Sequence, residues 1–426
     1  MNLIWKEYIQ FLHDNGAKIP LEEGYCWLDN QIIKAYDIEG KLHNLYRIKI
    51  QKDLSITYKK YPEENFQIES WEDTTIRNKD RLDKLEQESI LLLQQYGFSD
   101  RKIIDTNSTG KDSMVKTYLA RKAGLTFNTF FNATTMDVAD SNRMAKKNQY
   151  KFIYPNKKLR GFYNWSKENN LIPSRLNRAC CLYFKENPTI ENFDANEKLL
   201  FLFGMRNSES NNRSTYGDTW INDKWGKKRD WLGILPIRQW TDEDIWLYTL
   251  REEIEINPKY KKGYDRVGCG IVCPNYSKST WALDKYWYPK LYERWQERLE
   301  QDFLSNYKWI VMNCTLQEYL QEAWTGGTFR PEPTPEVIKE FANYKGIDTE
   351  AAQKYFLRQC TNGCKNKRGN TRKIKELDVL AMNLKMFGRS IDKFMCKKCL
   401  LKYFNWTEED FQKQVQEFKS SGCKLF

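Results

Sequence analysis

The segment S-T-G-K-D-S at residues 108–113 is the part of the chain that predicts its fold. It follows a short apolar strand at residues 103–104, and it opens a helical pattern that contains Met114 and Val115. A turn of this kind binds phosphate well, because a glycine lets the backbone come close and the N-terminus of a helix favours an anion. We therefore expect residues 108–113 to hold a phosphate group, with Lys111 as its positive charge. The alternative is a capped helix that follows an ordinary loop.

The residues around this loop predict an α/β fold with a parallel sheet. A helical pattern covers residues 82–96, and a second strand-like run lies at residues 126–132, after the helix that the loop opens. Strands that alternate with helices are typical of βαβ units. The spacing does not fit the pattern G-x-x-x-x-G-K-S/T, which argues against an ordinary P-loop NTPase.

We predict three regions along the chain. Residues 1–85 mix helix-like and strand-like patterns as an α+β region, and we find no chemistry in them. Residues 86–325 form the parallel-sheet domain, which is flanked by helices. Residues 336–426 form a basic, helical C-terminal region, and the turn-rich stretch R-P-E-P-T-P at residues 330–335 separates it from the domain before it.

Composition excludes several classes of protein. The chain has 426 residues, of which 15% are aromatic, so it contains enough apolar material for a folded core. Its apolar runs are far shorter than the roughly 18 residues that a membrane span needs. The N-terminal residues show no secretory signal. We therefore expect a folded, soluble protein of the cytoplasm that has no membrane partner.

Positive charge is concentrated near the C-terminal end. The chain carries 69 Lys and Arg against 57 Asp and Glu, a net charge of +12, and residues 354–426 contain 17 basic and 7 acidic residues, which is +10 of that total. Such a concentration is typical of a protein that binds a polyanion, because each cation placed on a phosphate releases counterions. We therefore expect DNA or RNA as a partner. A solvated basic surface is the alternative.

The loop and several other segments resemble the PP-loop family of ATP pyrophosphatases. The signature of that family is S-G-G-K-D-S, and Thr109 replaces its second residue here. L-I-P-S-R-L-N-R-A-C-C-L-Y-F-K at residues 171–185 resembles the R-x-C-C-x-x-x-K region of the phosphoadenosine phosphosulfate (PAPS) reductase-like group. G-M-R-N-S-E-S-N-N-R at residues 204–213 and W-T-D-E-D-I-W at residues 240–246 resemble two further elements of this group, so the resemblance covers most of residues 85–300.

The resemblance implies that ATP, bound with Mg²⁺, is cleaved between its α and β phosphates, so that a substrate is adenylated and pyrophosphate is released. Lys111 would steady the pyrophosphate, and Asp112 would help to hold the metal or the loop. Arg206 and Arg213 offer two guanidinium groups, which suit the binding of sulfate or phosphate. The alternative is that they are two exposed arginines on a loop. The nucleotide would lie on Ser108, Thr109, Gly110, Lys111, Asp112 and Ser113, and the substrate on Lys185, Arg206 and Arg213.

Metal sites have to be built from cysteine, because the chain has 11 cysteines and only two histidines. Cys180 and Cys181, with C-G-I-V-C at residues 269–273, resemble the C-C…C-x-x-C set that carries a [4Fe–4S] cluster in assimilatory adenylylsulfate reductases and, with variations, in DNA phosphorothioation enzymes. Three residues rather than two separate Cys269 from Cys273. An iron–sulfur cluster, a zinc ion and unliganded thiols are therefore three alternatives for this set.

A second set of cysteines lies in the basic C-terminal region, at Cys360, Cys364, Cys396 and Cys399. Four thiolates at such spacings predict a tetrahedral structural zinc ion, which a small module with a thin core needs. Cys423 follows them, but S-G-C-K-L-F at residues 421–426 lacks the E-C-G-L-H pattern around the nucleophilic cysteine of sulfonucleotide reductases. We assign no catalysis to it.

Taken together, these features favour an ATP-dependent enzyme that transfers sulfur to nucleic acid, similar to the DNA phosphorothioation (DndC-type) branch. Sulfur-donor and modification-complex proteins would then be its partners. A sulfonucleotide reductase is the first alternative, although the resemblance implies that reductases usually lose the Lys-Asp pair that Lys111 and Asp112 keep here. A nucleic-acid-binding accessory protein with a relic loop is the second alternative.

Overall fold

The computed structural model divides the chain into two compact units. The first contains Met1–Asn169 and Asn177–Glu293, and the second contains Asn170–Leu176 and Arg294–Phe426. The middle of the 204–213 segment and part of the 330–335 stretch lie outside the described residues. The structure describes every position except 52, 63–64, 176, 210–212, 214, 222–228, 327–329, 331, 358, 367–368, 370–372, 375, 389–390, 392 and 424, and the side chain of Lys278.

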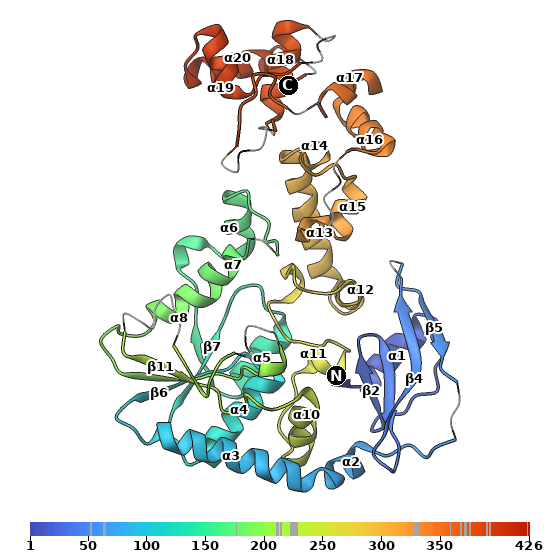
Figure 1. Cartoon of the computed structure of the whole chain (residues 1–426), viewed down its shortest axis with the longest axis vertical. Coiled ribbons are helices and arrows are strands. Elements are labelled where there is room, and N and C mark those ends of the chain that lie inside the picture. Colours follow the sequence, from blue (N-terminus) through green and yellow to red (C-terminus); the bar gives the residue numbers. More distant parts are fainter. Residues whose placement is uncertain are drawn as a thin grey trace. The chain divides into compact units, whose positions relative to one another are not determined.

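A six-stranded sheet forms the centre of the first unit (Figure 1). Its strands are β6 (Lys102–Thr106), β7 (Asn128–Asn132), β8 (Lys151–Ile153), β9 (Leu199–Leu202), β10 (Thr219–Trp220) and β11 (Trp231–Ile234). They lie in the order β10-β11-β9-β6-β7-β8, and every neighbouring pair is parallel except β10 with β11. This arrangement confirms the predicted α/β fold.

Helices connect and cover these strands. They are α3 (Lys79–Gly97), α4 (Lys111–Lys122), α5 (Ala139–Lys147), α6 (Phe162–Glu168), α7 (Ala179–Cys181), α8 (Asn187–Glu191), α10 (Asp242–Arg251), α11 (Pro258–Lys261) and α12 (Lys278–Trp287). All four residues of β9 are buried, as expected for a strand covered on both faces. Leu200 and Leu202 pack with α3, α4 and α10, whereas Leu199 and Phe201 pack with Phe193 on the opposite face.

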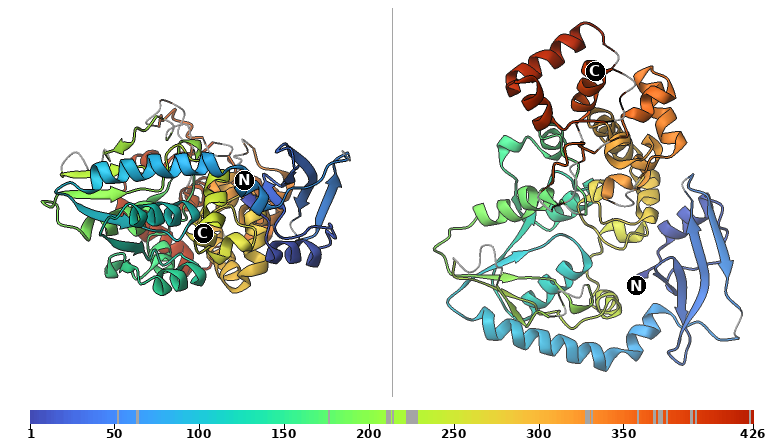
Figure 2. Two further views of the ribbon diagram at one scale, coloured as in Figure 1. Left: turned by 90° about the horizontal axis from the view of Figure 1, so that it is seen from below. Right: turned by 45° about the horizontal axis from the view of Figure 1, so that its top comes forward.

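The N-terminal residues form a second sheet in the same unit. Its strands are β1 (Asn2–Leu3), β2 (Cys26–Asp29), β3 (Ile32–Tyr36), β4 (Leu42–Ile50) and β5 (Ile56–Lys60); they pair antiparallel in that order, and α1 (Lys6–Asp14) and α2 (Trp71–Arg77) flank them. Helices α2 and α3 lead from this sheet to the six-stranded one (Figure 2). Leu3 and Trp27 share a hydrophobic core with Val115 of α4, so the two sheets are packed together.

The second unit is mostly helical within its described residues. Most of α13 (Pro289–Ser305) belongs to it, followed by α14 (Lys308–Met312), α15 (Leu316–Gln321), α16 (Pro335–Lys345), α17 (Thr349–Lys354), α18 (Leu377–Phe387), α19 (Lys397–Phe404) and α20 (Glu408–Ser420). Seven of the eleven residues of α18 are buried, so this helix is the core of the C-terminal part. Among the helices that the structure describes, none is both long and apolar enough to cross a membrane.

Candidate functional site

The predicted phosphate loop lies between the carboxyl end of β6 and the first turn of α4. Asn107 holds it in place: its Oδ1 accepts the backbone N–H of Thr109 at 2.7 Å, and its Nδ2 donates to Thr117 Oγ1 at 2.8 Å and to the carbonyl of Ser113 at 3.1 Å. One amide side chain thus ties the loop to two turns of the helix that follows. Asn107 was not predicted as a site residue, because only the fold shows that its side chain points back to the helix.

Thr109 explains why the related signature has glycine at this position. Its φ is +61°, in the left-handed region that glycine adopts without strain. Threonine is held there because Asn257, at the start of α11, donates to its Oγ1 at 2.8 Å. Tyr260 of the same short helix accepts the backbone N–H of Lys111 at 3.1 Å. The loop is therefore supported from a segment that lies about 150 residues further along the chain.

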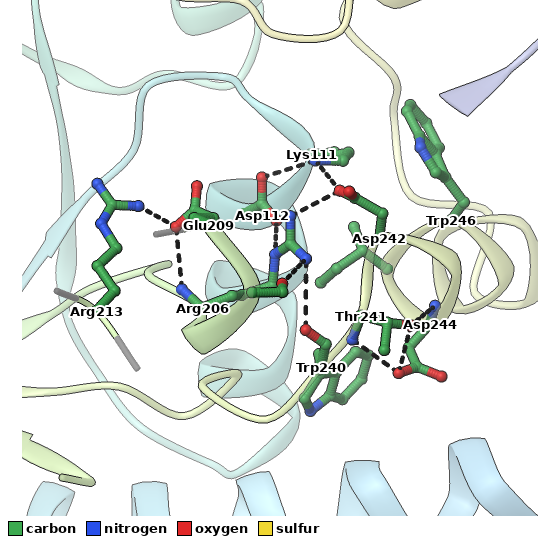
Figure 3. Close-up of polar contacts among 12 residues, drawn as sticks. Lys111, Asp112, Arg206, Glu209, Arg213, Trp240, Thr241, Asp242, Asp244 and Trp246 are labelled. Carbon is green, nitrogen blue, oxygen red and sulfur yellow. Dashed lines mark hydrogen bonds and ion pairs between the residues drawn. The ribbon is translucent and has the colours of Figure 1, made fainter. Parts of the chain in front are cut away.

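Two cations and two carboxylates form a network at the start of α4 (Figure 3). Lys111 Nζ lies 3.1 Å from Asp112 Oδ2 and 3.0 Å from Asp242 Oδ1. Arg206 Nε donates to Asp112 Oδ1 at 2.5 Å, and its Nη2 donates to Asp242 Oδ1 at 2.7 Å. The side chains of Lys111 and Arg206 are 6% and 3% exposed, so both cations are held in fixed, buried positions.

The network favours the charged forms of Lys111, Arg206 and Asp242. Burial alone would lower the pKa of Lys111, but Asp112 and Asp242 outweigh it and raise this pKa above its usual range. Burial would likewise raise the pKa of Asp242, but Lys111 and Arg206 lower it well below its usual range. The start of α4 therefore offers a phosphate two permanent positive charges in addition to the helix N-terminus.

Arg206 and Arg213, which were predicted to bind the substrate, are joined through Glu209. Arg206 precedes a short 3₁₀ turn at Asn207–Glu209, and its backbone N–H donates to Glu209 Oε2 at 3.1 Å. Arg213 donates to the same oxygen through Nη1. Arg206 is thus a buried part of the network, whereas Arg213 reaches it from a half-exposed position.

Asp242 reaches this network because of a capping box at the start of α10. Thr241 Oγ1 accepts the backbone N–H of Asp244 at 3.1 Å, and Asp244 Oδ2 accepts that of Thr241 at 2.8 Å. The cap places Asp242 at the first residue of the helix. Asp242 was not among the residues predicted for the site.

A cavity of about 1320 Å³ opens above the loop. Thr109 is buried behind the loop surface, but the other predicted nucleotide and substrate residues line the cavity together. Arg178 and Arg266 also line it, which adds to its positive charge. The predicted residues that line it are Ser108, Gly110, Lys111, Asp112, Ser113, Lys185, Arg206 and Arg213.

Lys185 connects this cavity with the first set of cysteines. It lies in a π-helical turn at Leu182–Glu186, directly after Cys181, and its ammonium group donates to the side chain of Cys269. A hydrogen bond from Cys273 and the charge of Lys185 lower the pKa of Cys269 well below its usual range. A hydrogen bond from Cys180 lowers the pKa of Cys181 to about 7.

The first set is therefore two hydrogen-bonded thiol pairs, Cys180 with Cys181 and Cys269 with Cys273, which also interact electrostatically. Soft thiolates are the donors that iron–sulfur clusters take, so the chemistry of the set fits such a cluster. The extra residue between Cys269 and Cys273 is accommodated by a 3₁₀ turn in which Gly270 has φ +68°. A β-carbon on Gly270 would lie 2.6 Å from the carbonyl oxygen of Met136, so this turn requires glycine.

The second set has the geometry of a site for a single metal ion. In the part of the chain that the structure describes, one group of three or more His, Cys, Asp or Glu side chains has all its ligand atoms within 4.8 Å of one another. It consists of Cys360, Cys364, Cys396 and Cys399. Cys399 Sγ lies 3.7 Å from Cys360 Sγ and 3.3 Å from Cys364 Sγ. Four sulfurs about 2.3 Å from a tetrahedral zinc ion lie about 3.8 Å apart. These four cysteines could therefore hold a metal ion.

Backbone and amide groups position this second set. The backbone N–H of Cys396 donates to Cys360 Sγ at 3.3 Å. Asn383, buried in α18, accepts the N–H of Met395 at 2.8 Å and donates to its carbonyl at 3.0 Å. The residue before Cys396 is thus fixed to the core helix of the module.

Comparison with known proteins assigns the chain to a family. The model of the phosphoadenosine phosphosulfate reductase domain matches residues 102–275. An uncharacterized protein of Methanocaldococcus jannaschii is 30% identical over 295 residues, which are 67% of this chain and 70% of that protein. The chain belongs to the phosphoadenosine phosphosulfate reductase domain family. The family match contains the phosphate loop and the first cysteine set, but it excludes the N-terminal sheet and the second cysteine set.

Two named proteins are similar to shorter parts of the chain. The adenosine 5'-phosphosulfate reductase of Salinibacter ruber is 28% identical over 24% of this chain and 38% of its own length. Sulfate adenylyltransferase subunit 2 of Rhodospirillum rubrum is 27% identical over 42% of this chain and 68% of its own length. The proteins to which this chain is similar thus include one that is named for sulfonucleotide reduction and one that is named for adenylyl transfer.

Proposed function

We propose that this protein is an enzyme that binds ATP with Mg²⁺ at residues 108–113, cleaves it between the α and β phosphates, and transfers sulfur to nucleic acid. The observation that carries the proposal is the network of Lys111, Arg206, Asp112 and Asp242 at the N-terminus of α4. Positive charge fixed in a buried site before the substrate arrives is the main way in which an enzyme stabilises a developing anion.

Each group in the network has a role in this reaction. The oxygen of the acceptor attacks the α phosphorus, and the bond between that phosphorus and the bridging oxygen breaks, so pyrophosphate leaves with the bonding electrons. Lys111 and Arg206 would bind the leaving pyrophosphate in place of their present carboxylate partners. Asp112 would then be free to hold Mg²⁺, which neutralises phosphate charge when it is bound.

Sulfur would enter from the first cysteine set. In each pair one thiol has a lowered pKa, Cys181 in the first pair and Cys269 in the second. Lys185, which interacts with Cys269, lines the cavity. Thiolates are the reactive form of cysteine. A sulfur nucleophile held here would displace AMP from the adenylated acceptor. If these cysteines hold an iron–sulfur cluster, Cys180, Cys181, Cys269 and Cys273 are its ligands, and the cluster supplies iron-bound sulfur chemistry next to Lys185.

The C-terminal region would bring the nucleic acid. It carries most of the net charge of the chain, and its four cysteines have the geometry of a structural zinc site. A metal ion there would hold the basic segments in one shape. Sulfur-donor and modification-complex proteins are further partners under this proposal.

The second candidate function is sulfonucleotide reduction. It is favoured by the thiol pairs next to Lys185 and by the similarity to an adenosine 5'-phosphosulfate reductase. Lys111 and Asp112 favour the first function instead. The resemblance implies that reductases usually lose this Lys-Asp pair, whereas here both residues are present and belong to the charged network.

Pyrophosphate release distinguishes these functions. Protein purified without oxygen is given ATP and Mg²⁺, alone or with duplex DNA or transfer RNA, and compared with Lys111→Ala and with Lys84→Ala on the exposed surface of α3. Release that depends on Lys111 and rises with one nucleic acid supports the proposal. Sulfite formation from a sulfonucleotide and a thiol, without pyrophosphate release, would instead establish the reductase. Salt-dependent DNA binding with neither reaction would indicate an accessory protein.

A further inference from the structure

The cavity is larger than one nucleotide requires. Its volume is about 1320 Å³, whereas pockets for ligands of this general size are about 300–1,000 Å³. The part next to residues 108–113 is accounted for by phosphate binding. Part of the remaining wall comes from the start of α12 and from the N-terminal sheet, in which the sequence showed no chemistry.

This second wall is fixed relative to the phosphate loop. Trp246 Nε1, on α10, donates to Asn2 Oδ1 at 3.1 Å, and Tyr36 donates to Glu243 Oε2 at 2.8 Å. Tyr8, on α1, packs so closely against the residues that follow α11 that a β-carbon on Gly263 would lie 2.1 Å from its ring. The N-terminal sheet is therefore a rigid part of the site.

The two walls differ in charge. The lysines and arginines that line the cavity lie between residues 111 and 266, on the side of the phosphate loop. The described side chains that line the cavity from the N-terminal sheet and α12 include one charged group, Asp29, and Lys34 pairs with it at 2.6 Å. The N-terminal ammonium of Met1 is also part of the lining, and it pairs with Asp242 at 3.2 Å. The other polar groups there are amides and hydroxyls. They belong to Asn2, Asn30, Gln31, Ser277, Ser279 and Thr280.

Two of these amides are on a preorganised turn. Asn30 and Gln31 join β2 to β3 as a two-residue hairpin, with φ values of +47° and +68°. Positive φ at both residues is typical of the tight turn that matches the twist of the two strands. The turn is held by the pairing of Asp29 with Ile32 on either side of it. The backbone of this turn is therefore fixed before a ligand binds, and both of its residues line the cavity.

We propose that this neutral wall is the acceptor subsite and that it binds a nucleobase. The cations on the described part of this wall, the Met1 ammonium and Lys34, are each paired with a carboxylate, so they offer little to sulfate or phosphate. Asn and Gln amides pair with base edges, and hydroxyls and apolar side chains complete such a pocket. This inference rests on the proposed function for the reaction that follows binding. It names the group of the nucleic acid that the cavity recognises, and it gives residues 1–60 a role in choosing the acceptor.

Free nucleosides test the proposal, because they are uncharged and the basic C-terminal region contributes little to their binding. The protein is first saturated with Mg²⁺ and an ATP analogue that has a methylene group between its α and β phosphorus atoms. Binding of adenosine, guanosine, cytidine, uridine and thymidine is then measured by equilibrium dialysis. We expect one of these nucleosides to bind, and Gln31→Gly and Ser279→Ala each to weaken it about fivefold.

Gln149→Gly is the matched control. Gln149 also has positive φ, at +56°, is exposed, and lies outside the cavity lining, so both glycine variants keep the backbone and differ in position alone. The proposal is overturned if no nucleoside binds, or if Gln31→Gly and Gln149→Gly bind equally well. Pyrophosphate release with no nucleoside binding would leave the proposed function standing and remove this subsite. Nucleoside binding without pyrophosphate release would do the reverse.

Discussion

Lys111 and Arg206 share a single carboxylate oxygen, Asp242 Oδ1, at 3.0 and 2.7 Å. Two like charges are close to each other in a buried site because this carboxylate, with Asp112, compensates them. Asp242 Oδ1 thus lies between two cations in the way that a bound phosphate oxygen would. The free protein thus holds its cations ready, at the cost of an ion-pair network that the ligand has to replace.

Asp242→Asn tests this relationship. We expect it to lower the free energy of unfolding by about 1–3 kcal/mol, because a partly buried pair loses one partner. Pyrophosphate added without Mg²⁺ should then raise Tm more in the variant than in the wild type, since it supplies the missing negative charge. Differential scanning calorimetry of both proteins measures this.

Asp100→Asn is the control for that experiment, because Asp100 pairs with Lys198 on the surface and its side chain is 68% exposed. Its Tm should stay within about 1 °C of the wild type with and without pyrophosphate, because exposed ion pairs contribute little. An equal pyrophosphate effect in wild type and Asp242→Asn would contradict the role given to Asp242.

Thr109 gives a second prediction, about the backbone of the loop. Alanine and glycine at this position both remove the hydroxyl that accepts from Asn257, but only glycine relieves the left-handed backbone. Thr109→Gly should therefore be more stable to urea than Thr109→Ala by about 1 kcal/mol. At the exposed helical residue Arg121 the order should reverse, with Arg121→Ala more stable than Arg121→Gly by nearly as much. The same order at both positions would contradict the strain assigned to Thr109.

Much of the fold and the loop could be predicted from sequence, because these features are local. The strand, turn and helix around residues 108–113 follow from neighbouring residues. The grouping of the second cysteine set was predicted from two closely spaced pairs, Cys360 with Cys364 and Cys396 with Cys399. Local pattern also pointed to Lys185, which does line the cavity with the loop.

The support of the loop could not be predicted, because it comes from far along the chain. Asn257 reaches Thr109 across 148 residues, and Asp242 is indistinguishable in sequence from any acidic residue at a helix start. The amides of Asn30 and Gln31 gave no signal either, since a polar hairpin turn is common. Their position in the cavity depends on packing between two sheets.

The second cysteine set predicts one bound zinc ion per chain. Cys399→Ser should reduce the zinc content, measured on protein purified without chelators, from about one ion per chain to a small fraction of that, because one of four ligands is lost. It should also lower Tm, since binding of a structural metal contributes to folding. Cys423→Ser, which removes a cysteine outside the group, should leave both unchanged. Full zinc content in Cys399→Ser would contradict a four-cysteine site.

Asp284 predicts how stability depends on pH. It is buried on α12, Tyr264 donates to its Oδ1 at 2.7 Å, and its Oδ2 has no hydrogen-bond partner among the described residues. Burial raises its pKa from 3.8 to about 6, although nearby Lys259 and the Tyr264 hydroxyl act in the opposite direction. The folded protein therefore binds this proton more tightly than the unfolded chain does.

A raised pKa in the folded state contributes stability that is complete below pH 4 and is lost as the pH rises through 6. Relative to Asp284→Asn, which does not titrate, the wild type should lose about 2 kcal/mol of unfolding free energy between pH 4 and pH 7. Urea unfolding of both proteins at several pH values in this range measures the difference. The other titrating groups are the same in both proteins, so their contributions cancel in the difference between the two unfolding free energies. A difference that is flat with pH, or that grows in favour of the wild type, would show that Asp284 is ionised in the folded protein throughout.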